Sequence, residues 1–254
     1  ETLSQVKPPR FPGEPPTAFS LGNLDKDKTK VNAIRNYPEN TDVCVEYVYS
    51  TPSVLNGGSS AVTDGRNVSI KVYHSLIAMP ENDYEVRFDD PRVGYFTTEV
   101  DDQTATNSTP YRDLVHRWNL VKKDPNAVLS EPVTPITWLM ENTTPVEWRA
   151  TVEAGVLEWN KAFEKAGFKN AMVVKMQPDD AVWDAGDIRY NVLRWTSSPN
   201  NPPFGDYGPS FVNPRTGEIL ESDIIWYHNH LRSYRNRYLI ETGAANPKAR
   251  TLNT

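Results

Sequence analysis

Apolar and polar residues alternate in short runs through the first half of the chain. Val43–Tyr49 and Val68–Ile77 are the clearest of these runs, and turn residues such as Asn56-Gly57-Gly58 separate them. Alternation with a period of two is typical of strands that bury one face. Leu114–Val121 continues the same pattern. We therefore expect an antiparallel, β-rich region over residues 37–130.

The second half begins with a strand pattern, Ile136–Glu141, and then changes to a helical one. Thr144 at the N-cap, Pro145 at the first helical position and Glu147 two residues later predict a capping box. Gly167 is a typical C-terminal stop. Between these signals lie about 22 residues, or about 33 Å of helix. The apolar positions that would form one buried stripe recur at intervals of three or four: Trp148, Val152, Val156, Trp159, Phe163 and Ala166.

Further strands are expected after this helix. Ala171–Met176 and Ile188–Trp195 have strand patterns, and a strand–helix–strand unit implies parallel strands with a right-handed crossover. Tyr207–Val212 and Glu218–Ile225 flank Asn213–Gly217, a turn sequence that predicts a hairpin with positive φ at its glycine. A final predicted helix covers residues 227–241, which are polar and aromatic.

Composition narrows the class of protein. The chain has 254 residues, a formal net charge of −6 and 38% apolar residues, which is typical of a globular protein. No apolar run reaches the roughly 20 residues of a membrane span, and without a basic excess a nucleic-acid partner is not expected. Residues 1–36, rich in Pro, Lys and Asp, predict an extended arm, so the expected division is 1–36, 37–130 and 131–254. The chain starts at Glu1 without a signal-like segment, and we expect a trimmed or processed end.

Cysteine and tryptophan are interpreted as core residues. Cys44 is the only cysteine and lies in an apolar strand, so we expect a small buried hydrophobe, with a reactive thiol as the alternative. Seven tryptophans could form a platform for sugars. Trp148 and Trp159 belong to the helical stripe, however, and Trp138 and Trp195 to predicted core strands, so packing is the favoured interpretation.

Four histidines are the candidate metal ligands. His74 and His116 lie in strand-like runs, where a hydrogen-bonded structural histidine is expected. His228 and His230 would face one side of a strand, but on the predicted helix they point about 200° apart and cannot share an ion. A zinc-binding protein that uses this pair stays an open alternative. The sequence contains no H-E-x-x-H, G-x-S-x-G, P-loop or G-x-G-x-x-G motif.

Acidic residues gather in several loops. Such neighbours are usually solvated or form turns, and no twelve-residue calcium loop is present, although calcium binding stays possible. The clusters are Asp89-Asp90, Asp101-Asp102, Asp179-Asp180, Asp184 and Asp187.

Five sequence markers occur in an order that resembles one protein family. They are Phe88–Phe96, Trp159–Ala171, Tyr207-Gly208-Pro209, Pro214–Ile219 and Trp226–Asn229. Together with the predicted order of strands and helices, they resemble large bacterial zinc-dependent metalloproteases of the zincin type, which are distantly similar to matrixins. The resemblance runs from about Tyr37 to the end of the chain.

The resemblance implies an α+β protein, in which an antiparallel β-rich region precedes the upper half of a zincin-like domain with a mixed sheet and one long crossover helix. It implies an exported protein, in the periplasm, on the outer-membrane surface or outside the cell. Zinc would be held by a C-terminal part beyond Thr254, so no catalytic or metal-binding residue is assigned here, and the chain alone would be inactive with apolar surface exposed. The implied substrate-binding edge for peptides or proteins is Tyr207, Gly208, Pro209, Ser210, Phe211 and Val212.

Two details complete the expectation. The first strand of the hairpin would lie at the edge of the sheet and pair with substrate backbone, and Pro209 would interrupt that ladder because it has no N–H. The alternative is a non-catalytic, β-rich surface module that binds peptide or glycan.

Overall fold

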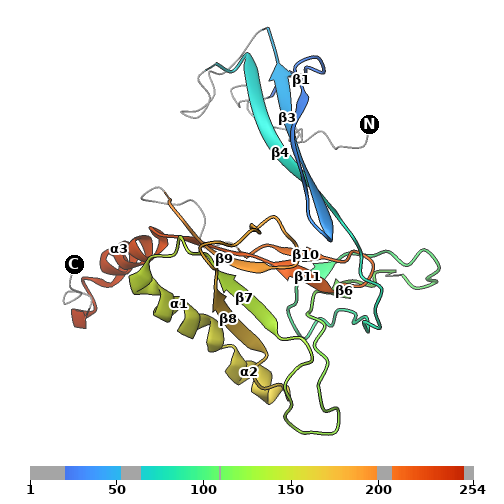
Figure 1. The fold of residues 1–254 in the computed structure, drawn as a ribbon, viewed down its shortest axis with the longest axis vertical. Coiled ribbons are helices and arrows are strands. Elements are labelled where there is room, and N and C mark those ends of the chain that lie inside the picture. The colour runs from blue at the N-terminus through green and yellow to red at the C-terminus, as the bar shows by residue number, and fades with distance from the viewer. Residues whose placement is uncertain (1–20, 53–63, 109, 199–207, 249–254) are drawn as a thin grey trace. The chain divides into compact units, whose positions relative to one another are not determined.

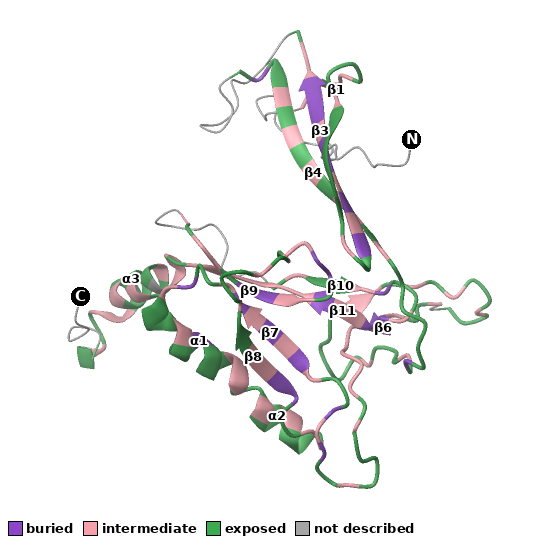
Figure 2. Cartoon of the chain, viewed as in Figure 1, coloured by how far each residue is buried: buried purple, intermediate pink, exposed green. Residues whose placement is uncertain are grey.

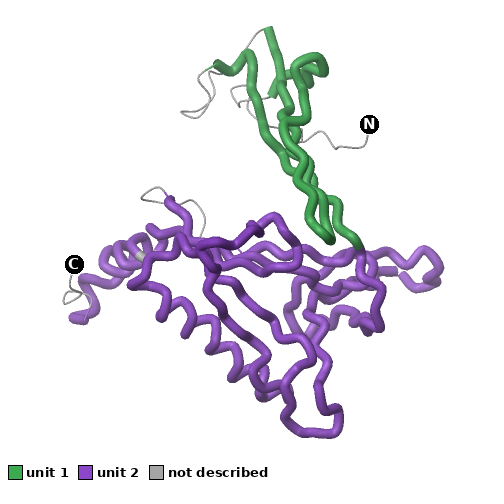
Figure 3. The backbone as a smooth tube through the Cα atoms, viewed as in Figure 1, with its two compact units in different colours: residues 1–78 green, residues 79–254 purple. Residues whose placement is uncertain are grey.

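The computed structural model describes residues 21–52, 64–108, 110–198 and 208–248. It confirms an α+β chain, which divides into two compact units, residues 1–78 and 79–254 (Figure 3). This division differs from the expected boundaries after residues 36 and 130. The predicted arm is wrong for Lys30–Asn36, because these residues form a strand of the first unit.

The first unit is a four-stranded antiparallel sheet around β3 (Figure 1). Its central strand pairs with β4 over its whole length, as the alternating patterns predict. On the other side β3 pairs with β2 and, further along, with β1. The strands are β1 (Asn23–Leu24), β2 (Lys30–Asn36), β3 (Asn40–Ser50) and β4 (Asn67–Ile77).

The core of this sheet comes from alternate positions of β3. Val45, Tyr47 and Tyr49 are buried together, and β3 is the buried strand in Figure 2. Cys44 is 4% exposed, which confirms the prediction of a small buried hydrophobe. The Tyr47 hydroxyl lies 3.0 Å from Nε2 of His74 on β4, so His74 is a hydrogen-bonded structural histidine, as expected.

The second unit contains a four-stranded parallel sheet with the order β12-β9-β7-β8. The predicted parallel pairing of the strands before and after the helical stretch is confirmed for β7 and β8. The predicted mixed sheet is wrong, because the antiparallel hairpin β10–β11 forms a separate two-stranded sheet. The bounds are β7 (Ile136–Met140), β8 (Met172–Met176), β9 (Asn191–Thr196), β10 (Ser210–Val212), β11 (Ile219–Ser222) and β12 (Ile224–Tyr227).

The predicted long helix is two helices in succession, α1 (Val146–Leu157) and α2 (Asn160–Lys165). The Glu158 N–H still donates to the Ala154 carbonyl at 3.1 Å, but the Trp159 N–H donates only three residues back, to the Val156 carbonyl at 3.3 Å. Next to this break, the Asn160 side chain donates to the Met172 carbonyl at 3.0 Å and accepts from the Met172 N–H at 2.8 Å. The clamp holds the start of α2 against the start of β8, so a single uninterrupted helix is wrong.

The two ends of this helical stretch differ in how well the sequence predicted them. The capping box is wrong: Pro145 is the N-cap, and no side chain caps the helix. Thr144 is instead buried. At the other end Gly167 has a φ of 90° and donates to the Glu164 carbonyl at 3.0 Å, while Phe168 donates to the Phe163 carbonyl at 2.9 Å. These two bonds form a Schellman motif and confirm the predicted stop.

The remaining elements are short, apart from the last helix. The predicted strand Leu114–Val121 is confirmed only at β6 (Leu114–Val115), which pairs with β5 (Thr97–Thr98); beyond Val115 it is wrong. The final helix is confirmed from His230 onward as α3 (His230–Thr242), but its predicted start is wrong, because Tyr227 belongs to β12. Within the described ranges, none of the helices combines the length and the apolar character that crossing a bilayer requires.

Candidate functional site

The segment predicted to bind substrate forms the outer strand of the hairpin. Ser210, Phe211 and Val212 make up β10, Gly208 and Pro209 precede it, and Tyr207 lies outside the described residues. Among the described strands, β10 pairs only with β11. Phe211 is 44% exposed. The strand is therefore an exposed edge rather than the middle of a sheet.

The backbone hydrogen bonds show which groups of β10 face outward. Asn213 N–H donates to the Glu218 carbonyl at 2.9 Å, and the Pro209 carbonyl accepts from Asp223 N–H at 3.0 Å. Residues 209 and 213 therefore face β11. Because successive residues of a strand alternate in direction, the N–H and C=O groups of Ser210 and Val212 point to the open edge.

Pro209 does not interrupt this open edge. Its backbone faces β11, and its carbonyl also accepts from the Ser222 hydroxyl at 2.8 Å. The expected gap in the outer ladder at Pro209 is therefore wrong: its missing N–H falls on the inner side of the hairpin. An extended peptide would meet the donors and acceptors of Ser210 and Val212.

The turn of the hairpin is fixed by close packing. Gly217 has a φ of 80°, as its turn position predicts. A Cβ at this position would lie 2.4 Å from the Val115 carbonyl oxygen, so only glycine fits. The Gly217 carbonyl accepts from the Arg117 N–H at 3.1 Å. Next to it, the buried Glu218 carboxylate accepts from Nδ2 of Asn82 at 2.9 and 3.0 Å.

A pair of carboxyl groups, the buried Glu221 and the partly buried Asp223, lies at the other end of β11. Glu221 is only 3% exposed, and burial, together with the nearby charge of Asp223, raises the pKa of Glu221 to about 9. Burial also raises the pKa of Asp223. At neutral pH Glu221 therefore keeps its proton and donates a hydrogen bond to Asp223. The other Glu221 oxygen, Oε1, has no hydrogen-bond partner in the described part of the chain.

This pair connects the hairpin to the parallel sheet. Asp223 Oδ1 accepts from the Val192 N–H of β9 at 2.9 Å. Next to it, Asn191 Oδ1 accepts from the Ser222 N–H at 2.9 Å, and Asn191 Nδ2 donates to the Thr137 carbonyl of β7 at 3.0 Å. Since Glu221 is shielded from solvent, we interpret the pair as a structural joint and not as a catalytic dyad.

A large apolar groove opens on the same unit. It has a volume of about 840 Å³, within the usual range of ligand pockets. Its three walls are the parallel sheet, the helices α1 and α2, and the segment around His116–Leu120. The side chains that form these walls include Trp138, Met172, Leu193, Ile224, Trp226, Val152, Val156, Trp159, Phe163, Trp118 and Leu120.

Tryptophans dominate the region around this groove. Trp138 is 5% exposed, as predicted for a core residue, but Trp159 is 63% exposed, so its predicted burial is wrong. Trp195 stacks between Trp148 and Trp226, with ring centroids 6.4 and 6.2 Å apart. Spacing along the sequence gave no sign of this three-ring stack.

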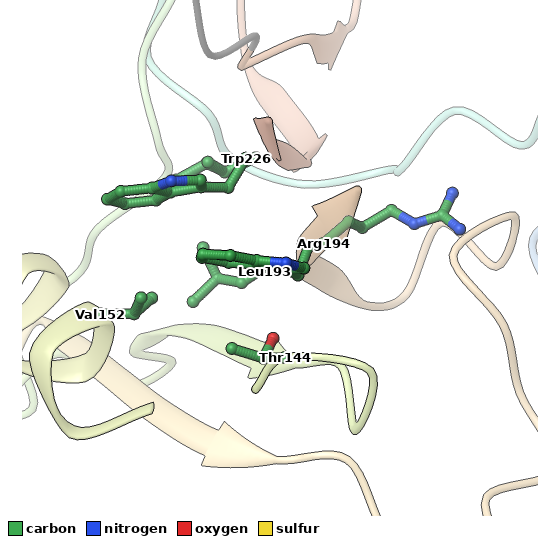
Figure 4. A pocket seen from close by; sticks show the side chains of 7 residues that line it. Thr144, Val152, Leu193, Arg194 and Trp226 are labelled. Carbon is green, nitrogen blue, oxygen red and sulfur yellow. The ribbon is translucent and has the colours of Figure 1, made fainter. Parts of the chain in front are cut away.

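A small void of about 10 Å³ lies beside the stack (Figure 4). Val152, Leu193 and Trp226 surround it, and Thr144 closes it from below in this view, which shows where the side chain expected to cap α1 lies instead. Arg194 extends away from the void, and its Nε lies 3.1 Å from Glu141 Oε1. The void is apolar and only about the size of one water molecule, so we expect it to be dry.

The histidines are dispersed. His116 Nε2 lies 2.9 Å from the Thr98 hydroxyl, and burial lowers the pKa of His116, which confirms a hydrogen-bonded structural histidine. His228 precedes α3, and its Nδ1 accepts from Ser198 N–H at 3.0 Å. His230 begins α3, with its ring 4.2 Å from that of Tyr234.

No three His, Cys, Asp or Glu side chains come together as a possible metal site anywhere in the described ranges. Two carboxylates of the acidic segments noted in the sequence form ion pairs with arginines two residues away: Asp90 pairs with Arg92, and Asp187 pairs with Arg189. We therefore assign neither a metal ion nor a step of hydrolysis to the described residues.

Comparison with known proteins gives one match. Residues 5–123 are similar to a protein family described as a domain of unknown function (DUF5117). The match covers the first unit and continues into the second as far as Lys123. No curated protein and no solved structure matches the chain.

Proposed function

We propose that this chain is part of an exported zinc-dependent metalloendopeptidase, in which it supplies the scaffold and the edge strand that holds the substrate. The observation that carries the proposal is the open edge of β10, where the backbone groups of Ser210 and Val212 have no partner strand among the described residues. The five sequence markers that resemble zincin-type metalloproteases support the same function.

The edge strand would bind a peptide by strand addition. An extended substrate that pairs with β10 satisfies the outward donors and acceptors of Ser210 and Val212, and main-chain pairing of this kind accepts many side chains. The exposed Phe211 ring, on the face of the hairpin, offers an apolar contact for one of them. The anchored turn at Gly217 and the joint at Glu221 and Asp223 hold the edge in position, so binding requires little ordering.

The zinc ion would be bound by the C-terminal part of the same protein and would activate the water that attacks the peptide bond. The residues of this chain would bind and orient the substrate for that attack.

A proline at Ser210 tests the proposal in the parent protein. Ser210→Pro removes an outward N–H and leaves the inner ladder intact, because residue 210 faces away from β11. Loss of one backbone hydrogen bond to substrate should lower kcat/KM by about tenfold with a fluorogenic peptide. Ser210→Ala is the matched control and should retain wild-type kcat/KM. Equal kcat/KM for the proline variant, at unchanged thermal stability, would show that β10 does not hold the substrate.

The same edge also favours the alternative, a module that binds peptide without cleaving it. The parent protein distinguishes the two functions directly. A protease cleaves the peptide, and a zinc chelator stops the cleavage; a binding module retains the intact peptide with or without the chelator. In both cases Ser210→Pro weakens the interaction, so cleavage is the decisive readout.

A further inference from the structure

The first unit has one long strand with an open outer edge. β4 contains 11 residues and pairs with β3 over its whole length, and it has no second partner among the described strands. It contains neither proline nor glycine, and its pairing with β3 has no bulge. Proteins usually shorten, bend or charge such an edge, because its free backbone groups readily pair with another strand.

Two hydrogen bonds just beyond the ends of β4 show which of its residues face outward. The Thr51 N–H donates to the Arg66 carbonyl at 2.8 Å, and the Ala78 N–H donates to the Glu39 carbonyl at 2.9 Å. Residues 66 and 78 therefore face β3, and because the register between them is continuous, so does every even-numbered residue of β4. The outward N–H and C=O groups belong to Asn67, Ser69, Lys71, Tyr73, Ser75 and Ile77. These six residues are exposed or half-buried, as the striping of β4 in Figure 2 shows.

The opposite edge of the sheet is protected in ways that β4 is not. The pairing of β2 with β3 has a bulge between Val31 and Ala33, and β2 carries two cations, Lys30 and Arg35. Both features disfavour the addition of a strand. The only Lys, Arg, Asp or Glu of β4 is Lys71, which lies opposite Glu46 of β3 and so faces a complementary charge within its own sheet.

The sequence of β4 is complementary to itself around Val72. Two antiparallel copies with Val72 opposite Val72 bring outward residues against outward residues, and only this register uses the whole strand. The pairs are Asn67 with Ile77, Ser69 with Ser75, Lys71 with Tyr73, Val68 with Leu76, and Ile70 with His74. Lys71 then lies beside an aromatic ring, which attracts a cation, whereas a centre at residue 71 would place Lys71 opposite Lys71. The pairing would also cover Tyr73 and Leu76, which are 55% and 62% exposed.

We propose that two copies of this chain associate through β4, as an antiparallel pair of strands related by a two-fold axis at Val72. Each outward N–H of one strand then donates to an outward carbonyl of the other, and the two four-stranded sheets become one. A second copy fits this edge because the pairs on both faces of the strand are complementary. The inference uses the first unit only, so it does not depend on the proposed function.

Disulfide formation in the full chain tests the predicted register. Across the two-fold axis the two residues at position 72 form a non-hydrogen-bonded pair, with Cα atoms about 4.5 Å apart, which suits a disulfide. Ile70→Cys is the matched control, because Ile70 is also half-buried and packs against the same core, but its two copies would lie roughly 14 Å apart along the strands. Under oxidation Val72→Cys should form a covalent dimer at least tenfold faster than Ile70→Cys. Equal rates, or no dimer from Val72→Cys, would overturn the inference.

A proline at Ser69 tests the association without a crosslink. By sedimentation equilibrium the average mass of the wild-type chain should rise with concentration from 28.8 kDa toward twice that value. Ser69→Pro removes an outward N–H from each copy and should raise the dissociation constant at least tenfold, whereas Ser69→Ala should leave it unchanged. Unaltered amide exchange at Val72, whose N–H faces β3, shows that the proline variant keeps the β3–β4 ladder. A wild-type chain that stays monomeric, or a dimer that Ser69→Pro does not weaken, contradicts the proposed pairing.

Discussion

The buried carboxyl pair predicts that one isosteric substitution, Glu221→Gln, stabilises the protein. Glu221 has an ordinary pKa of 4.5, and burial beside Asp223 raises it to about 9 in the folded state. Below about pH 4.5 both states are protonated. Above that pH the unfolded chain loses the proton and the folded chain keeps it, so unfolding releases a proton and the free energy of unfolding falls as pH rises.

The size of this change in the free energy of unfolding follows from the difference between the two pKa values of Glu221. Each pH unit between the two pKa values lowers the free energy of unfolding by about 1.36 kcal/mol. At about pH 7.5 the loss amounts to up to about 4 kcal/mol, and the two coupled carboxyls share it. Glutamine does not ionise, and its amide can donate to Asp223 as the protonated carboxyl does. Glu221→Gln should therefore raise the free energy of unfolding at this pH by about 2 to 4 kcal/mol.

Urea unfolding followed by tryptophan fluorescence measures this change in the second unit alone. All seven tryptophans lie between Trp118 and Trp226, so the signal does not report on the first unit. The difference between Glu221→Gln and wild type should shrink as the pH falls toward 4.5. A variant less stable than wild type at pH 7.5, or a difference that does not depend on pH, would refute the reasoning.

Asp187 is a matched control, because its substitution should lower the free energy of unfolding where Glu221→Gln raises it. It is also buried, at 1% exposed, but hydrogen bonds from Arg189 lower the pKa of Asp187. Nε and Nη2 of Arg189 donate to its two oxygens at 2.9 and 2.6 Å. Ionised Asp187 therefore stabilises the folded state above about pH 3.8, and this stabilisation is lost as the pH falls through the lowered pKa of the folded state. Asp187→Asn should destabilise the second unit at pH 7.5 by about 1 to 3 kcal/mol.

Two further predictions use other positions. Gly217→Ala should lower the free energy of unfolding by about 2 kcal/mol or more, because the residue has positive φ and its Cβ would overlap the Val115 carbonyl; urea unfolding with unchanged stability would contradict the described turn. Cys44 should react with a thiol reagent at least a hundredfold more slowly in the native protein than in urea, because it is buried in the first unit; equal rates would show that β3 is accessible.

The sequence predicted those elements whose patterns match their burial. The alternating pattern of β4 matches its alternating exposure, and the strand patterns on either side of the helical stretch predicted the parallel pair β7 and β8. Gly167 and Gly217 were predicted because a positive φ excludes most other residues. These are local signals, and tertiary packing agrees with them.

The predictions from sequence fail where tertiary contacts determine the local structure. Every residue of β2 is exposed, so no alternation of buried and exposed positions marks these residues as a strand. Thr144 could cap a helix, but packing buries it beside Val152, and the Asn160 clamp to Met172 interrupts the helix. The hairpin forms a separate sheet, and the side chain of Asp223, between β11 and β12, connects it to β9 through the Val192 N–H. Two acids at alternate positions of an apolar strand were the signal that could have revealed this junction.

Amide exchange at β10 tests the central claim most directly. In the parent protein, a substrate-like peptide with a zinc-chelating hydroxamate should slow exchange at the outward N–H groups of Ser210 and Val212 by at least tenfold. Phe211, whose N–H faces β11, should exchange at the same rate with and without the peptide. Protection at neither Ser210 nor Val212, while the peptide is bound, would contradict a substrate-binding role for this strand.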